Sequence, residues 1–169
     1  MSGIHTNCES AEMRQAILND LVSEEGEATN HVKQLLVFSK ALGLTKGEVT
    51  KSKANKNTRE AISMFLELSQ DKNINKGLTA LATYKEQIRK VAKTKESGLR
   101  EYYGITNDQA LQFFRTHANK NIVWHEMLDE IISEKEYPLA LHAAGTLCDA
   151  WWHYLDGVTT QSMMQRMVY

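Results

Sequence analysis

The sequence has one proline, two cysteines and almost no net charge. Because proline breaks helix interiors, a single proline in 169 residues favours long, uninterrupted helices. The two cysteines, Cys8 and Cys148, are too few for a disulfide framework and are typical of the reducing cytosol. With 20 basic against 21 acidic residues, the chain lacks the basic surplus that nucleic-acid-binding domains usually carry.

Long apolar segments are also missing. No run approaches the roughly 20 apolar residues that a membrane-spanning helix needs. Residues 1–8 have neither the basic nor the apolar region of a secretory signal, so we expect a cytoplasmic protein. The chain does have 42% hydrophobic and 24% charged residues, which predicts one soluble globular domain over residues 1–169.

Apolar residues recur at helical spacing along most of the chain, as Met13, Ile17 and Leu21 illustrate. Residues 45–57 form the most polar stretch and are expected to be a loop, whereas Gly104 is expected to end a helix. The pattern predicts helices over residues 13–22, 32–42, 58–68, 78–103, 106–132 and 139–155. Since no strand-like alternation persists, we expect an all-α bundle of about six helices.

Carboxylates and imidazoles gather in three places along these helices. Glu24 and His31 are two helical turns apart, so both would point inward if the helix were continuous. Glu86 lies two helical turns from Leu78 and Leu81 on its own helix, so it could face the interior. Asn121 and His125 follow His117 by four and eight residues, rotated by about 40° and 80°.

Mixed imidazole and carboxylate ligands suit iron or manganese, and helical bundles are a known place to gather them. Each cluster also has a plainer interpretation. Glu24 fits a solvated helix end, His31 fits a hydrogen-bonded or surface histidine, and Glu86 fits an exposed ion pair with its basic neighbours. His117 and His125 fit such interpretations least well. His142 and His153 would line the same cavity only if the last helix faces it.

Four motifs occur in one order along the chain and carry a resemblance to a known family. They are Glu24-Glu25-Gly26-x4-His31 with Leu42-Gly43, then Leu99-Arg100-Glu101-Tyr102-Tyr103-Gly104-Ile105, then Phe113-Phe114-x2-His117, then Trp152-x2-Leu155-Asp156-Gly157-Val158. Over residues 12–160 the sequence resembles the haem-oxygenase-like diiron oxidases. These are relatives of the Chlamydia protein associating with death domains and, more distantly, of pyrroloquinoline-quinone synthesis protein C and TenA.

The resemblance implies a haem-oxygenase-like helical bundle that binds two irons and uses dioxygen on a small substrate. Chemistries known in the group include oxidative C–C cleavage, N-oxygenation, decarboxylation and formation of an aminobenzoate from a tyrosine side chain. By position, Glu24 and His31 match the first carboxylate and histidine ligands. Glu86 matches the central carboxylate, and His117 matches the histidine that opens the third motif.

The third motif departs from the family pattern, which is His-x3-Asp-x2-His. Asn121 stands at the aspartate position, Trp124 is seven residues after His117, and His125 is eight. An amide lacks the negative charge that an iron pair favours, so one metal site should be weaker or absent. A π-bulge between His117 and His125 would absorb the extra residue.

The chain also lacks two helices that family members usually carry before the Glu24 motif. Their absence should expose apolar surface, which a second copy of the chain would cover in a homodimer. Tail residues Met163, Met164, Met167, Val168 and Tyr169 either join that interface or pack on their own core.

Three functions follow from these observations. The first is a non-haem iron oxidase that binds one or two metal ions, iron or manganese. Its ligands would be Glu24, His31, Glu86, His117 and His125, with Asn121 at the position where the family pattern has aspartate. Tyr84, Trp124 and Trp151 would then shape its substrate pocket. The second is a metal-free enzyme that uses histidines and tyrosines as acids and bases. The third is a non-catalytic binding or regulatory subunit. The sequence does not name a substrate.

Overall fold

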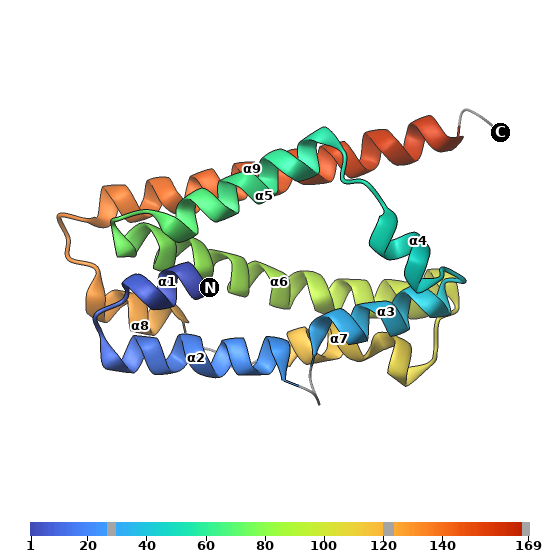
Figure 1. The fold of residues 1–169 in the computed structure, drawn as a ribbon, viewed down its shortest axis with the longest axis horizontal. Coiled ribbons are helices and arrows are strands. Elements are labelled where there is room, and N and C mark those ends of the chain that lie inside the picture. Colours follow the sequence, from blue (N-terminus) through green and yellow to red (C-terminus); the bar gives the residue numbers. More distant parts are fainter. Residues whose placement is uncertain (27–29, 120–123, 167–169) are drawn as a thin grey trace. The chain divides into compact units, whose positions relative to one another are not determined.

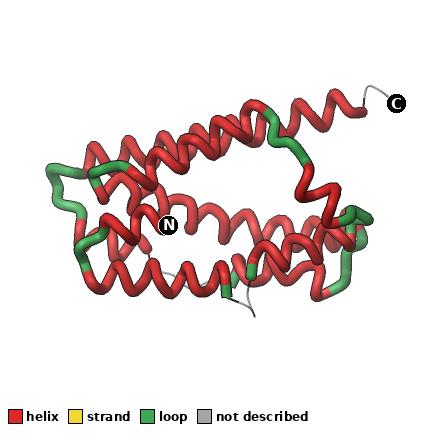
Figure 2. The backbone as a smooth tube through the Cα atoms, viewed as in Figure 1, coloured by secondary structure: helices red, strands yellow, loops and turns green. Residues whose placement is uncertain are grey.

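The computed structural model describes residues 1–26, 30–119 and 124–166, and within these ranges the chain is helical and has no strand (Figures 1 and 2). The helices are α1 (Ser2–Asn7), α2 (Ala11–Glu25), α3 (His31–Ala41), α4 (Lys46–Lys51), α5 (Lys56–Gln70), α6 (Ile74–Tyr103), α7 (Asp108–Ala118), α8 (Trp124–Ile131) and α9 (Tyr137–Arg166). The all-α prediction is confirmed. Across the described ranges, no helix is both long and apolar enough to span a membrane.

The helix boundaries have local causes that can be seen in the sequence. The side chains of Ser10, Asn30 and Asn107 accept hydrogen bonds from the first-turn backbone N–H groups of α2, α3 and α7. Gly104 follows α6 with a φ of 66°, and Gly43 follows α3 with a φ of 83°. Both glycines adopt the left-handed conformation that commonly ends a helix, as expected for these positions.

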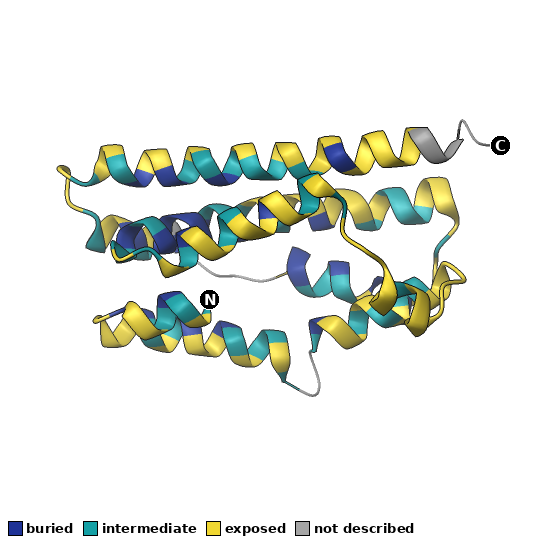
Figure 3. Cartoon of the chain, turned by 45° about the horizontal axis from the view of Figure 1, so that its top comes forward, coloured by how far each residue is buried: buried dark blue, intermediate teal, exposed yellow. Residues whose placement is uncertain are grey.

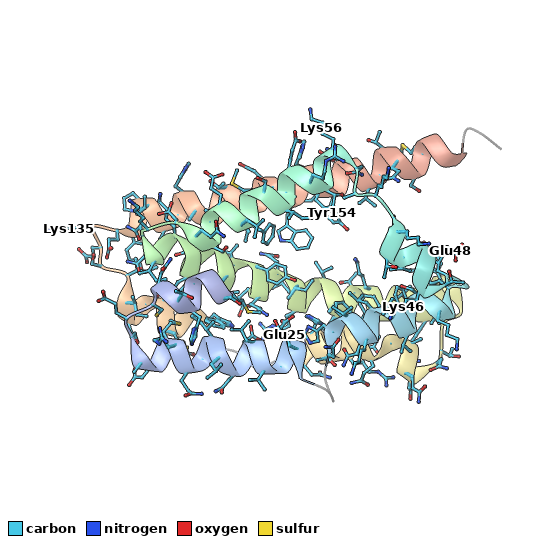
Figure 4. The ribbon with its side chains drawn as sticks, viewed as in Figure 1. Glu25, Lys46, Glu48, Lys56, Lys135 and Tyr154 are labelled. Atoms are coloured by element: carbon cyan, nitrogen blue, oxygen red, sulfur yellow. The ribbon has the colours of Figure 1, made fainter. Side chains whose placement is uncertain are left out.

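The structure has nine helices in the described ranges, against about six expected. Two local differences explain most of the gap. The polar stretch 45–57 contains α4, which begins with a capping box in which Thr45 and Glu48 satisfy each other's backbone N–H groups (Figure 4). The helix expected over residues 106–132 ends at Ala118, and α8 begins at Trp124.

The chain divides into two compact units. The α5–α9 unit comprises Met1–Cys8, Lys53–Tyr84 and His125–Tyr169, and the α3–α7 unit comprises Glu9–Ser52 and Lys85–Trp124. The boundary passes through α6, so each unit gathers segments that are distant in the sequence. The single domain expected over residues 1–169 stays a prediction.

In the α5–α9 unit, helices α5 and α9 pack against each other and run side by side in Figure 1. Buried positions of α9 lie along one side of the helix in Figure 3, and Ala143 and Leu147 pack there with Leu68 of α5. Tyr84 and Trp151 stack against this core with ring centroids 5.8 Å apart and planes inclined by 8°. These two aromatic residues are therefore core residues of this unit.

Gly157 allows α9 to approach α5 closely. A Cβ at this position would lie 2.5 Å from Cβ of Asn57 and 2.8 Å from its Cγ. Because both Cβ positions are fixed by the backbone, Gly157→Ala should force the helices apart and lower the free energy of unfolding by about 1–3 kcal/mol. Urea unfolding followed by circular dichroism measures this loss.

Gly145 on the same helix provides the control, since a Cβ there would meet nothing within 4 Å. Gly145→Ala should stabilise the protein by about 0.5–1 kcal/mol, because alanine restricts the unfolded chain more than glycine does. Equal effects of the two substitutions would contradict the close approach of α5 and α9 at Gly157.

The α3–α7 unit is held by an aromatic contact and by ion pairs. The ring of Phe38 on α3 meets the ring of Phe114 on α7 edge to face, with centroids 5.0 Å apart. Arg115 of α7 pairs with Glu96 of α6 at 2.8 Å and with Asp108 at 2.6 Å. These contacts fix α7, which carries His117, against α3 and α6.

Candidate metal centre

Three side chains that the sequence singles out converge in the α3–α7 unit. Glu24, His31 and His117 each offer one donor atom, and these atoms all lie within 4.8 Å of one another. The residues come from three helices, α2, α3 and α7. Figure 4 labels Glu25, the last residue of α2, directly after Glu24. Both histidines are buried and Glu24 is partly exposed.

Glu24 and His31 meet because the helix between them is interrupted. The sequence-based argument placed both on one face only if the helix were continuous, and in the structure α2 ends at Glu25 and α3 begins at His31. Asn30 helps to shape the junction, since its side-chain amide donates to the carbonyl of Glu25 at 3.1 Å. Nδ1 of His31 then donates to Oε2 of Glu24 at 2.7 Å. The pair forms as expected, but across two helices.

His117 is oriented by its own helix. Its Nδ1 donates to the backbone carbonyl of Phe113 at 2.8 Å, so the neutral ring carries its lone pair on Nε2. The ring centroids of His117 and His31 are 4.3 Å apart, and the Phe113 ring lies 4.3 Å from His117. A histidine held through Nδ1 by a carbonyl or carboxylate is a common arrangement for a metal ligand.

Nε2 of His31 is the most informative atom of the cluster. It is buried and has no hydrogen-bond partner within the part of the chain that the structure describes. Leaving such an atom unsatisfied costs free energy. Because Nδ1 donates to Glu24, Nε2 carries the lone pair of the neutral ring and is suited to a metal ion or a ligand proton.

Two residues that the sequence reading did not select complete the cluster. The Lys85 ammonium lies 2.6 Å from Oε1 of Glu24 and 2.6 Å from Oδ2 of Asp20. The side chains of Lys85 and Asp20 are 6% and 0% exposed, so this is a buried ion triad.

The contact between Glu24 and Lys85 keeps both side chains charged. Burial by itself would raise the pKa of Glu24, but hydrogen bonds from His31 and Lys85, with the charge of Lys85, hold it well below its usual range. Burial would lower the pKa of Lys85, but the charge and hydrogen bond of Asp20 and the hydrogen bond to Glu24 raise it. Glu24 is therefore ionised and Lys85 is charged at neutral pH.

Spacing along the helix offered a signal for one of the two missed residues, Asp20. On α2 the buried positions are Met13, Ile17 and Asp20, and Glu24 continues the same spacing of three and four. On α6 spacing does not separate Lys85 from Glu86, because Lys85 follows the buried Leu81 by four residues and Glu86 follows the buried Ala82 by four.

The predicted ligand Glu86 does not join the cluster. Its Oε2 pairs with Arg89 at 3.1 Å, one turn along α6. One residue of helix turns a side chain by about 100°, so Lys85 and Glu86 face different surroundings. The plainer interpretation of Glu86, an ion pair with a basic neighbour, is the one that the structure shows.

The remaining predicted ligands fall outside the structural description. Asn121 and the side chain of His125 lie outside the described residues. The π-bulge expected between His117 and His125 falls on a stretch that includes residues 120–123, which also lie outside the described residues, so it stays a prediction.

The predicted substrate-pocket residues are divided between the units. Trp124 is fully buried in the α3–α7 unit, whereas Tyr84 and Trp151 belong to the α5–α9 unit. A common pocket stays a prediction. A separate groove of about 520 Å³ lies along the end of α3 and the start of α4, and none of the predicted site residues lines it.

These residues fit one metal ion better than two. Two histidines and one carboxylate are the ligand set of many non-haem Fe(II) oxygenases, and each of the three residues offers one donor atom here. A second ion would need further carboxylates. Among the described residues the only other carboxylate of the cluster, that of Asp20, is paired with Lys85.

Comparison with known proteins identifies related sequences. The TENA/THI-4/PQQC family model matches residues 1–161. A 4-aminobenzoate synthase of Nitrosomonas europaea is 29% identical over 152 residues, which are 86% of this chain and 61% of the relative. The chain thus spans about three fifths of that protein's length.

Two relatives from Chlamydia carry the same name. The 4-aminobenzoate synthase of Chlamydia trachomatis serovar D is 26% identical over 159 residues, covering 92% of this chain and 69% of the relative. The Chlamydia pneumoniae protein is 26% identical over 160 residues, covering 92% and 71%.

Proposed function

The chain belongs to the TENA/THI-4/PQQC family, and we propose that it is an oxygenase-type enzyme with a metal ion held by Glu24, His31 and His117. The ion would be iron, with manganese as the alternative, and the second reactant a small metabolite. The observation that carries the proposal is the convergence of two buried histidines and one carboxylate within 4.8 Å.

Iron bound by such ligands supplies activation of dioxygen. The chain's own residues have supporting tasks. The Phe113 carbonyl keeps the proton of His117 on Nδ1, so its Nε2 presents the lone pair. Glu24 accepts from Nδ1 of His31, so these two residues would bind one ion with the ion in place of that proton. Lys85 keeps the Glu24 carboxylate ionised, so that it retains the charge that a metal cation requires.

The relatives' name suggests a first product to look for. Because three relatives are named 4-aminobenzoate synthase, we include formation of 4-aminobenzoate in the proposal. The chain covers 61% of the Nitrosomonas relative, so this activity needs a direct assay. Mass spectrometry of reactions with Fe(II), a reductant and dioxygen would detect the product.

Metal analysis tests the proposed function directly. Protein loaded with Fe(II) without oxygen should retain stoichiometric metal after desalting. His31→Ala and His117→Ala should each weaken binding by at least about 100-fold, since loss of an outer-shell partner alone costs 10- to 100-fold. Isothermal titration with Fe(II) or Mn(II) measures the affinities.

His142 supplies the control for these variants, because it is exposed on α9 in the other unit. His142→Ala should bind metal as the wild type does. Unchanged affinity in both His31→Ala and His117→Ala would refute the proposed metal centre.

One observation favours a second candidate function. Lys85 pairs with both carboxylates, and Glu24 also accepts a hydrogen bond from His31, so these contacts form without any metal. A metal-free protein of this fold could use His31 and His117 as acid and base, or bind a ligand without catalysis. Wild-type protein that takes up no Fe(II) or Mn(II) would favour this candidate.

A further inference from the structure

The Glu24 carboxylate connects two different partners. Its Oε2 accepts from Nδ1 of His31 at 2.7 Å, and its Oε1 accepts from Nζ of Lys85 at 2.6 Å. The same Nζ lies 2.6 Å from Oδ2 of Asp20. Glu24 therefore has the His31 imidazole at one oxygen and an ammonium at the other.

Glu24 lies beside a cation in a way that is similar to a carboxylate that bridges two metal ions. In two-metal sites the paired ions share ligands and stabilise charge on both sides of the reacting group. Here the position between the Asp20 and Glu24 carboxylates is taken by the Lys85 ammonium. Contacts of 2.6 Å from Nζ to both carboxylates leave no room for an ion between them.

Burial makes this ammonium hard to replace. The side chain of Lys85 is 6% exposed and that of Asp20 is 0% exposed, so water does not screen their attraction. A divalent ion beside the ammonium would be repelled at close range, and displacing Lys85 would leave a buried cation without its partners.

We propose that Lys85 is a built-in cation that limits the cluster to a single metal ion, bound on the side of Glu24 that faces His31 and His117. This inference rests on the proposed metal-dependent function and specifies that the cluster binds one ion. It predicts that an ion bound here has no second metal within bonding distance of a shared ligand.

Titration with Mn(II) under nitrogen tests the inference, with bound metal counted by elemental analysis and examined by electron paramagnetic resonance. Wild-type protein should bind one Mn(II) per chain and give the six-line spectrum of an isolated ion. Lys85→Glu removes the ammonium and adds a third carboxylate. This variant should bind two Mn(II) per chain, with a spectrum altered by coupling between the ions.

Lys93→Glu is the matched control, because it makes the same charge change at an exposed position of the same helix. It should bind one Mn(II) with the wild-type spectrum. Circular dichroism of Lys85→Glu before and after metal addition shows whether the variant is folded when metal is counted. If it does not fold, Lys85→Met takes its place, because removing the ammonium alone should let Asp20 and Glu24 take up a second Mn(II), and one ion in folded Lys85→Met would overturn the role of Lys85.

The possible results separate this inference from the proposed function. Two coupled Mn(II) ions in the wild type, or a single ion in a folded Lys85→Glu, would overturn the role of Lys85 and leave the metal-dependent function standing. No Mn(II) or Fe(II) in the wild type would overturn the proposed function itself. One isolated ion in the wild type and two in Lys85→Glu support both.

Discussion

Replacing Lys85 with methionine should lower the free energy of unfolding by about 3–5 kcal/mol, because it removes one partner of a buried ion triad. Methionine fills much of the same volume, so the loss reflects charge rather than a cavity. The side chain of Asp20 is 0% exposed and would keep its negative charge away from water. Urea unfolding followed by circular dichroism at neutral pH measures the difference.

A second substitution separates the charge effect from packing. Asp20→Asn combined with Lys85→Met removes both members of one ion pair, so the double variant should recover about 1–3 kcal/mol relative to Lys85→Met alone. Lys93→Met, at an exposed position of the same helix, should change stability by no more than about 0.5 kcal/mol. A loss for Lys85→Met as small as that of Lys93→Met would show that the triad contributes little.

The fold class followed from signals that local chemistry controls. A single proline, apolar residues at helical spacing, and glycines at 43 and 104 indicated an all-α chain and two of its helix ends. The missed helix α4 lies in a stretch with few apolar residues, and it is held by a capping box rather than by an apolar face. Periodicity arguments do not detect such a helix.

The cluster was predictable in part. Glu24, His31 and His117 came from motif resemblance, and the structure brings them together although its helix breaks differ from those expected. Which residue of α6 faces them was not settled by composition, because Lys85 and Glu86 both look like exposed charges in the sequence. The structure distinguishes them, because Lys85 is buried and pairs with Asp20 and Glu24, whereas Glu86 pairs with Arg89.

Having Lys85 rather than Glu86 at the cluster changes the chemistry expected of the site. A carboxylate on α6 would add negative charge and favour a second metal ion, whereas an ammonium neutralises the carboxylates already there. Asn121, with an amide where the family pattern has a carboxylate, alters the charge in the same direction. Lys85 in the structure and Asn121 in the sequence motif would thus both reduce the capacity of the proposed site for cations.

Trp124 represents a third departure, at the position where the family pattern has a second histidine. It is 0% exposed and is among the largest fully buried side chains in the described residues. Trp124→Ala should therefore lower the free energy of unfolding by about 3–5 kcal/mol, through lost burial and the cavity that remains. The same urea unfolding assay measures it.

Trp124→Phe tests whether the indole N–H matters. Nε1 of Trp124 is buried and has no hydrogen-bond partner among the residues that the structure describes, so phenylalanine removes an unsatisfied donor while keeping most of the apolar volume. This variant should lose less than about 1.5 kcal/mol. Trp152→Ala, with a side chain 67% exposed on α9, should be nearly neutral. If Trp124→Phe costs as much as Trp124→Ala, the N–H has a partner after all, and Trp124 then stabilises the fold through a hydrogen bond as well as through packing.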